Sequence, residues 1–263
     1  MRYTHLFFDL DNTLWDFNSN SYDALRHALG ELGLLGKIAD YDQFYTIYHR
    51  VNDHLWDLYR EGAIAKPKLT VQRFEESFEK YGYPVPGRGA EINEAYLSGM
   101  PAQTRLVEGA RELLDYLAGR YRMAIITNGF REVQYDKMEQ SGLSGYFDKV
   151  FVSEEIGAQK PNKLIFEHAL KSMNAPKRST LMIGDSWEAD IVGARLSGLD
   201  QVFYDPMRKY TMLTADNKQD DRYKTIDFSQ LPPDFSMSTL LSAAKRRPVT
   251  LLIEALSQTT VFL

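Results

Sequence analysis

Short runs of apolar residues recur along the chain and predict the buried strands of a parallel sheet. Each run is continuous rather than alternating, which is typical of strands that are covered on both faces. The four strongest runs lie at residues 5–8, 123–126, 150–152 and 181–183. Two weaker runs, at 201–203 and 224–226, are candidates for further strands.

Amphipathic patterns with helical spacing separate the later apolar runs. They cover residues 110–117, 133–141, 164–173 and 189–196. From residue 110 onward helix and strand therefore alternate, which predicts an α/β fold: a Rossmann-like parallel sheet with helices on both faces. Sheets of this kind place their active sites at the carboxyl ends of the strands.

The segment from about residue 16 to residue 100 interrupts this alternation directly after the first predicted strand. Aromatic and aliphatic residues recur there at helical spacing, for example at Phe44, Tyr48 and Val51. Gly62 and Gly82 stand where such helices would end. We therefore expect an inserted all-helical domain with most of its aromatic rings in its core.

This pattern divides the chain into two domains and a tail. Residues 1–15 and 101–233 are predicted to form the α/β core, and residues 16–100 the helical domain. Residues 234–263 are left unassigned, because the two apolar runs of this tail fit helix and strand equally well.

Composition and charge narrow the possible partners. The 263 residues are 44% hydrophobic and 25% charged, as in ordinary globular proteins. The net charge is −5, so no overall positive field attracts a nucleic-acid polymer or an anionic membrane. The absence of cysteine excludes a thiol nucleophile, a thiolate metal site and disulfides.

No apolar segment approaches the roughly 20 residues of a membrane-spanning helix. The apolar run near the N-terminus is also too short for the core of a signal peptide. We therefore expect a cytoplasmic protein that makes no membrane contact and is a monomer by default, with a dimer as the alternative.

Two acids follow the first predicted strand. Asp9 and Asp11 stand two residues apart at the expected mouth of the sheet. Carboxylates this close repel each other and lose hydration unless a cation lies between them. A turn with capping acids is the structural alternative for this segment taken alone.

Groups that suit a phosphate follow later strands. Thr127-Asn128-Gly129 comes after the second strand, where a hydroxyl and main-chain amides can form a small anion-binding concavity. Lys160 precedes Pro161 at the start of a predicted helix and would neutralise a phosphoryl group if it points inward. An ordinary turn and a solvated lysine are the structural alternatives.

A second pair of acids, Asp185 and Asp190, flanks the turn between the fourth strand and the next helix. Because parallel strands end at one edge of the sheet, all four motifs are predicted to gather around one point. Their conjunction favours a phosphate-handling site over four independent turns. No Walker motif, nucleophile-elbow serine or histidine pattern for metal binding is present.

Taken together, the four motifs resemble those of the haloacid dehalogenase-like hydrolase superfamily, and the helical insertion resembles its helical cap. Residues 7–17 and 127–130 are most similar to the pyrimidine 5'-nucleotidase branch, whose members remove phosphate from nucleoside monophosphates. The resemblance covers about residues 3–231. It implies a phosphomonoester hydrolase, and within that class a 5'-nucleotidase, with a small phosphate ester as its partner.

The resemblance also implies a role for each motif. Asp9 would attack phosphorus and form an aspartyl-phosphate, while Asp11 would protonate the leaving oxygen and then deprotonate water. Thr127, the Asn128 amide and Lys160 would bind the transferred phosphoryl group. Mg²⁺ would be held by Asp9, the main-chain carbonyl of Asp11 and Asp185, with Asp190 as a ligand or a water-mediated support.

Other functions fit the same motifs. A phosphatase for phosphoglycolate or a sugar phosphate would use every motif residue, and so would a phosphomutase, which transfers the group to a second substrate hydroxyl. Asp11 argues against a dehalogenase, because a halide leaving group needs no proton. Outside enzymes, a receiver-like phospho-acceptor domain gathers similar groups, but such domains are about half this length and lack a large helical insertion.

Aromatic side chains near the motifs or in the helical domain are candidates for stacking on a nucleotide base. These are Trp15, Phe17, Phe130 and Tyr48, with Trp56 expected in the core instead.

Overall fold

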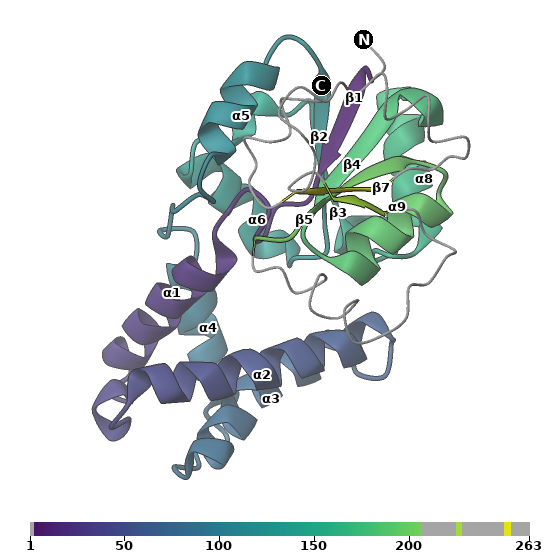
Figure 1. Cartoon of the computed structure of the whole chain (residues 1–263). Helices are drawn as coiled ribbons and strands as arrows, with labels where there is room; N and C mark the ends of the chain where they lie inside the picture. Colours follow the sequence, from purple (N-terminus) through teal and green to yellow (C-terminus); the bar gives the residue numbers. More distant parts are fainter. Residues whose placement is uncertain (1–2, 207–224, 228–249, 254–263) are drawn as a thin grey trace. The chain divides into compact units, whose positions relative to one another are not determined.

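The structure of the protein, a computed structural model, describes residues 3–206, 225–227 and 250–253 (Figure 1). Contacts within the chain group these residues into two compact units. The sheet unit comprises the described residues of 1–16, 106–131 and 142–263, and the helical unit comprises 17–105 and 132–141. Among the described residues, no helix is both long and apolar enough to cross a bilayer.

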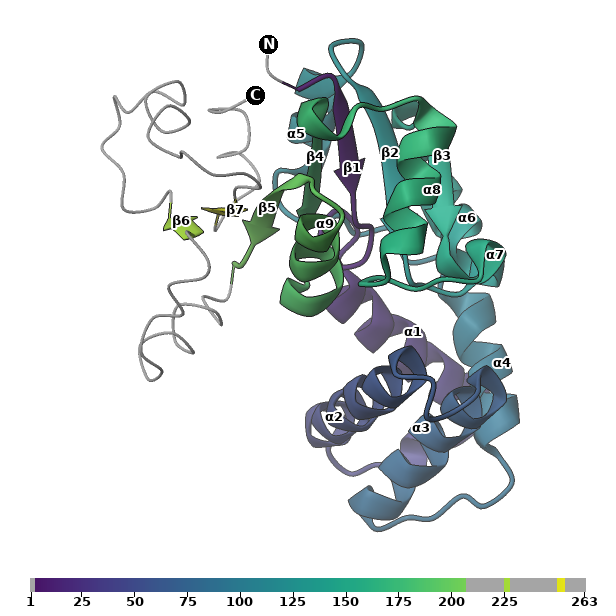
Figure 2. The same cartoon turned by 90° about the vertical axis from the view of Figure 1, so that its right-hand side faces the viewer.

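The sheet unit contains seven described strands, which lie in the order β3-β2-β1-β4-β5-β7-β6. Their bounds are β1 His5–Phe8, β2 Arg122–Thr127, β3 Lys149–Val152, β4 Thr180–Gly184, β5 Asp200–Tyr204, β6 Thr225–Asp227 and β7 Thr250–Ile253. Every neighbouring pair is parallel, and β1 lies between β2 and β4 (Figure 2). The carboxyl ends of all these strands therefore lie at one edge of the sheet.

Helices cover both faces of this sheet. Figure 1 shows α5 on one side and α8 and α9 on the other. The helical segments of the unit are α5 Ala110–Leu117, η2 Ser144–Tyr146, α7 Ser153–Ile156, α8 Lys163–Met173, η3 Lys177–Ser179, η4 Trp187–Val192 and α9 Gly193–Leu196. The predicted fold class, a Rossmann-like parallel sheet with helices on both faces and an inserted helical domain, is confirmed.

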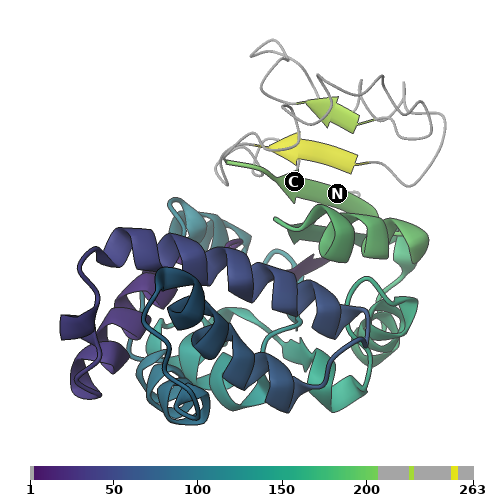
Figure 3. The same cartoon turned by 90° about the horizontal axis from the view of Figure 1, so that it is seen from below.

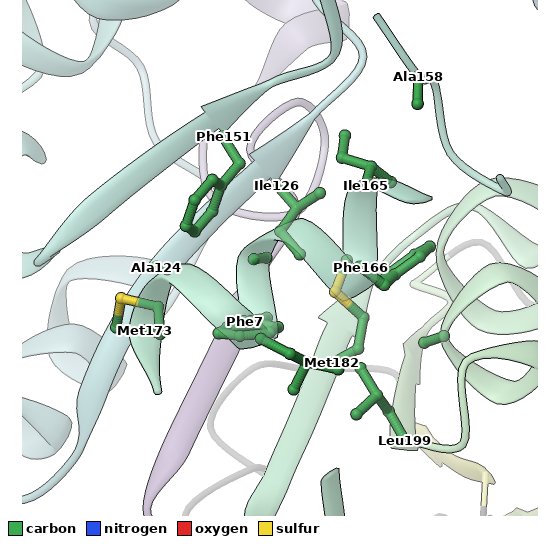
Figure 4. Close-up of a cluster of buried hydrophobic side chains, with 13 residues drawn as sticks. Phe7, Ala124, Ile126, Phe151, Ala158, Ile165, Phe166, Met173, Met182 and Leu199 are labelled. Carbon is green, nitrogen blue, oxygen red and sulfur yellow. The ribbon is translucent and has the colours of Figure 1, made fainter. Parts of the chain in front are cut away.

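One hydrophobic cluster fixes α8 against the sheet (Figure 4). Phe7 and Met182 contribute from adjacent strands, and Phe166 and Met173 contribute from α8, all at most 4% exposed. Burying side chains of this size contributes roughly 1.5–3 kcal/mol each. The cluster thereby anchors the helix that directly follows the Lys160 segment.

The helical unit is built from α1 Phe17–Glu31, η1 Leu35–Lys37, α2 Tyr41–Arg60, α3 Lys66–Tyr81, α4 Gly89–Gly99 and, from later in the chain, α6 Arg131–Gln140. The Asp40 side chain caps α2 by accepting a hydrogen bond from the Gln43 N–H. Gly82 ends α3 with φ of 93°, a left-handed conformation that glycine adopts without the strain of a Cβ. The helix end predicted at Gly82 is therefore correct.

The core of the helical unit is aromatic, but it also encloses a cation. Tyr48 stacks on Phe74 with ring centroids 5.5 Å apart. Arg73 is 2% exposed and donates hydrogen bonds to Asn93 Oδ1 at 2.6 Å and to Asn52 Oδ1 at 3.4 Å. Its guanidinium also lies 4.8 Å from the centre of the Phe74 ring. Neutral amides and a ring thus replace part of the hydration that burial removes.

Two elements depart from the sequence-based expectations. Helix α6, placed by the sequence division within 101–233, groups with the helical unit except for its first residue. Glu132 of α6 pairs with Lys66 of α3 at 2.8 Å, and the Lys137 ammonium lies 5.8 Å from the centre of the Phe17 ring. The predicted helix 189–196 is instead a π-helical turn, η4, followed by the short α9.

The tail left unassigned by sequence supplies a strand. Residues 250–253 form β7, which is inserted between β5 and β6 rather than added at the edge of the sheet (Figure 3). The weak apolar run at 224–226 corresponds to β6, displaced by one residue. The remaining tail residues lie outside the described part of the chain.

Candidate active site

The ends of three adjacent strands carry the candidate residues. Asp9 directly follows β1, Thr127 is the last residue of β2, and Asp185 follows β4. Because β2, β1 and β4 are neighbours, these ends meet at one edge of the sheet. Lys160 reaches this edge from the segment between α7 and α8.

Lys160 joins two of the acids. Its Nζ lies 2.6 Å from Asp9 Oδ1 and 2.6 Å from Asp190 Oδ1, and the lysine side chain is 2% exposed. Charge-assisted hydrogen bonds of this length are stronger than neutral ones. The buried cation therefore offsets part of the cost of burying two carboxylates together.

Thr13 joins the site as a residue that sequence reasoning did not assign. Its hydroxyl lies 3.1 Å from Asp185 Oδ1 and 3.4 Å from Asp9 Oδ2, and the residue is fully buried. Its single hydroxyl proton can be shared between these two acceptors. The signal was present in the sequence, since Thr13 follows Asp9 by four residues in the same turn.

The shape of that turn follows from one unusual residue. Asn12 has φ of 62°, a left-handed conformation that asparagine tolerates better than most residues. Its N–H donates to the Trp15 carbonyl at 2.7 Å, so the chain folds back immediately after Asp11. This reversal brings the Thr13 hydroxyl to the carboxylates of Asp185 and Asp9.

Burial shifts the pKa values of two of the acids, Asp9 and Asp185. Burial raises the pKa of Asp9 to about 7, with the nearby Asp190 and Asp11 charges acting in the same direction and Lys160 opposing them. The pKa of Asp185 is raised well above its usual range, again chiefly by burial. Burial alone would lower the pKa of Lys160, but Asp190 and Asp9 outweigh it and raise that pKa.

Asp190 is held by the π-helical turn η4. Its Oδ2 accepts a hydrogen bond from the Ser186 N–H at 3.0 Å, while Oδ1 faces Lys160. A Cβ on Gly184 would overlap the Asp190 carboxylate, so only glycine permits this close approach. Single π turns occur frequently at functional sites.

The segment after β2 contributes in two ways. Thr127 Oγ1 accepts a hydrogen bond from the Gly129 N–H at 3.1 Å, which closes the turn. The Asn128 side chain does not point at an open anion site. It is bonded to the main chain of Lys160 through both its oxygen and its nitrogen.

Asp11 lies in the turn after β1 but is not one of the three clustered acids, which are Asp9, Asp185 and Asp190. It is half-buried, and its charge contributes to raising the pKa of Asp9. The structure thus brings the seven residues singled out by sequence to one edge of the sheet.

Three of the acids could share a metal ion. One carboxylate oxygen from each of Asp9, Asp185 and Asp190 lies within 4.8 Å of the others. Hard carboxylate oxygens are the ligands that Mg²⁺ prefers. The donor set therefore fits Mg²⁺, with Lys160 already neutralising part of the charge on Asp9 and Asp190.

Three aromatic residues suggested for base stacking are buried in the structure. Trp15 is fully buried, Tyr48 is 1% exposed and Phe130 is 3% exposed. For these rings core packing replaces the suggested contact with a substrate, because none presents a face to solvent. Phe17 and Trp56 are half-buried.

A parallel sheet with an inserted helical unit and an acid-lysine-acid site at its carboxyl edge defines a class of enzyme. The chain belongs to the haloacid dehalogenase-like hydrolase family, whose pattern matches residues 3–198. The resemblance inferred from the four motifs is thereby confirmed, and with it the assignment to the hydrolases.

Individual relatives narrow the comparison. The chain is 38% identical over 205 residues to "Pyrimidine 5'-nucleotidase YjjG" of Escherichia coli. The matched region covers 76% of this chain and 84% of that protein. It is 36% identical to "Pyrimidine 5'-nucleotidase PynA" of Streptococcus pneumoniae, over 78% and 85% of the two chains. The structure of the "putative HAD-hydrolase YfnB" of Bacillus subtilis, bound to magnesium, matches with a TM-score of 0.77 and 27% identity over 98% of this chain and 97% of that one.

Proposed function

We propose that the protein is a Mg²⁺-dependent phosphatase that hydrolyses pyrimidine nucleoside 5'-monophosphates through an aspartyl-phosphate. The chemical part is carried by one observation: the buried Asp9 carboxylate lies 2.6 Å from the Lys160 ammonium. The substrate part is supported by the two curated relatives described as pyrimidine 5'-nucleotidases. We place the protein in the cytoplasm as a monomer.

In the first half-reaction a carboxylate oxygen of Asp9 attacks phosphorus in line. The phosphorus–oxygen bond to the nucleoside breaks, and the protonated Asp11 gives its proton to the leaving oxygen. Thr127, the main-chain amide of Asn128 and Lys160 hold the oxygens of the phosphoryl group. Splitting hydrolysis at a covalent intermediate replaces one difficult step by two easier ones.

In the second half-reaction the roles of the acids reverse. Asp11, now a carboxylate, takes a proton from a water molecule that attacks phosphorus and releases phosphate from Asp9. When bound by Asp9, the Asp11 carbonyl and Asp185, with Asp190 as ligand or support, Mg²⁺ supplies positive charge beside the phosphoryl oxygens. Lys160 keeps Asp9 beside a cation throughout, which favours its nucleophilic carboxylate form.

The test is phosphate release from UMP, dUMP, dTMP, AMP, phosphoglycolate and sugar phosphates, each with Mg²⁺ and with a chelator. We expect selective, chelator-sensitive turnover of the pyrimidine nucleotides. Preference for phosphoglycolate or a sugar phosphate would contradict the assignment of pyrimidine nucleotides as substrates, but would still be consistent with the proposed phosphatase mechanism. Transfer of the phosphoryl group to a second substrate hydroxyl would indicate a phosphomutase, and absence of turnover on every ester would favour a phospho-acceptor domain.

A further inference from the structure

The side chain of Asn128 is bonded to the main chain of a residue 32 positions away. Its Oδ1 accepts a hydrogen bond from the Lys160 N–H at 2.8 Å, and its Nδ2 donates to the Lys160 carbonyl at 2.9 Å. A primary amide that bonds to both polar groups of one residue imitates the pairing of two strands. The contact lies within the sheet unit and joins the segment after β2 to the segment before α8.

The segment that carries Lys160 has little regular structure of its own. It extends from the end of α7 at Ile156 to the start of α8 at Lys163 and belongs to no strand of the sheet. Lys160 nevertheless places its Nζ at 2.6 Å from two separate carboxylates. A long and flexible side chain holds such a position well only when its main chain is fixed.

The carboxamide and the backbone of Asn128 therefore have separate tasks. The backbone amide is the group that the proposed chemistry directs at the phosphoryl oxygens. The carboxamide is committed to Lys160 and is partly buried there, where loss of both bonds would leave the Lys160 N–H and carbonyl without these partners.

We propose that the Asn128 side chain is a positioning residue: it clamps the main chain of Lys160 and so sets the lysine ammonium between Asp9 and Asp190. The proposal rests on the proposed chemistry at Asp9 and Lys160, but not on the identity of the substrate. The clamp acts through Lys160 and never touches the transferred group.

A double-mutant cycle tests this role. Asn128→Leu keeps about the same volume but removes both hydrogen bonds, and Lys160→Met keeps the aliphatic stem but removes the charge. The two single variants and the double variant are compared with the unsubstituted protein by kcat/KM for p-nitrophenyl phosphate with Mg²⁺. Thermal unfolding of each variant reports whether it is folded. If Asn128→Leu does not fold, Asn128→Ala takes its place in the cycle.

We expect Asn128→Leu to lower kcat/KM by about 10- to 100-fold, as small misplacements of catalytic groups do. In the Lys160→Met background the same change should cost less than about threefold, because residues that act as a unit are not additive. An equal loss in both backgrounds, or activity of Asn128→Leu within about twofold of the unsubstituted protein, would overturn the proposal.

A second readout needs neither substrate nor metal. Hydrogen exchange of the peptide spanning residues 157–163 should accelerate in Asn128→Leu, while exchange in β1 stays unchanged. Unchanged exchange in residues 157–163 would overturn the clamp. If the unsubstituted protein turns over no phosphate ester, the proposed function fails, and this measurement still decides whether the clamp exists.

Asn162, two residues after Lys160 in the same segment, offers a matched control. The Asn162 side chain caps α8 by accepting a hydrogen bond from the Leu164 N–H at 3.0 Å and is not bonded to Lys160. Asn162→Ala therefore also removes a bond from an asparagine side chain to the main chain. We expect it to leave kcat/KM within about threefold, and a loss equal to that of Asn128→Leu would contradict a specific role for Asn128.

Discussion

At the residue scale, Asp9 faces opposing demands. The proposed attack on phosphorus needs the carboxylate, yet burial raises the pKa of Asp9 to about 7. Lys160 opposes that rise, but the neighbouring acids and the low polarity outweigh it. Keeping these acids ionised below neutral pH, as the proposed chemistry requires, would therefore be aided by a further cation.

This requirement predicts linked metal and proton binding. At the proposed metal site protons and Mg²⁺ would compete for Asp9 and Asp185, whose pKa values are both raised. The affinity for Mg²⁺ should therefore fall as the pH drops below about 7, and raising Mg²⁺ should move the acidic limb of the rate profile to lower pH. Calorimetric titrations between about pH 5.5 and pH 8 measure the effect. An affinity independent of pH over that range would contradict the prediction.

At the element scale, the turn after β4 depends on the absence of a side chain. A Cβ at Gly184 would overlap the Asp190 carboxylate, so Gly184→Ala must displace η4 or Asp190. We expect a loss of about 1–3 kcal/mol in stability and about 10- to 100-fold in kcat/KM.

Gly145 provides the comparison for this substitution. A Cβ there would meet no atom within 4 Å, so Gly145→Ala should change stability by less than about 0.5 kcal/mol and leave activity intact. Chemical denaturation and steady-state kinetics on both variants separate the two effects. Equal behaviour of the two variants would refute the steric argument.

The helical unit has a comparable dependence on Arg73. Arg73→Met leaves the side-chain oxygens of the buried Asn52 and the half-buried Asn93 without these donors, and should destabilise the protein by about 2–4 kcal/mol. Arg60→Met, which removes only an exposed pair with Asp57, should cost less than about 1 kcal/mol. Urea unfolding of both variants is the measurement, and a similar cost for the two would show that the buried network contributes little.

At the scale of the whole molecule, the candidate site belongs to one unit. Every residue assigned to it lies in the sheet unit, while the helical unit separates Asp9 and Asp11 from the other motifs in the sequence. The strands that carry these motifs could be predicted because continuous apolar runs mark buried parallel strands. Their convergence at one edge then follows from the parallel order alone.

Other features could not be predicted from local pattern. The order β5-β7-β6 depends on pairing between residues far apart in the sequence, and β7 comes from a tail with no decisive periodicity. Helix α6 groups with the helical unit because of contacts such as that between Lys66 and Glu132, which no spacing reveals. Likewise, sequence indicated Asn128 as an anion-site residue but not that its carboxamide bonds to Lys160.

The central claim is that Asp9 becomes phosphorylated during turnover, and trapping the intermediate tests it most directly. The enzyme, mixed with Mg²⁺ and its preferred phosphate ester, is quenched and treated with borohydride, which reduces an aspartyl-phosphate to homoserine. Peptide mass spectrometry should find homoserine at position 9, and Asp9→Asn should lose at least about 10³-fold in kcat. Asp200→Asn, at the first residue of β5 and so at the opposite edge of the sheet from Asp9, is the matched control and should retain activity. Rapid turnover with no modification at Asp9, or with modification at another acid, would contradict the account.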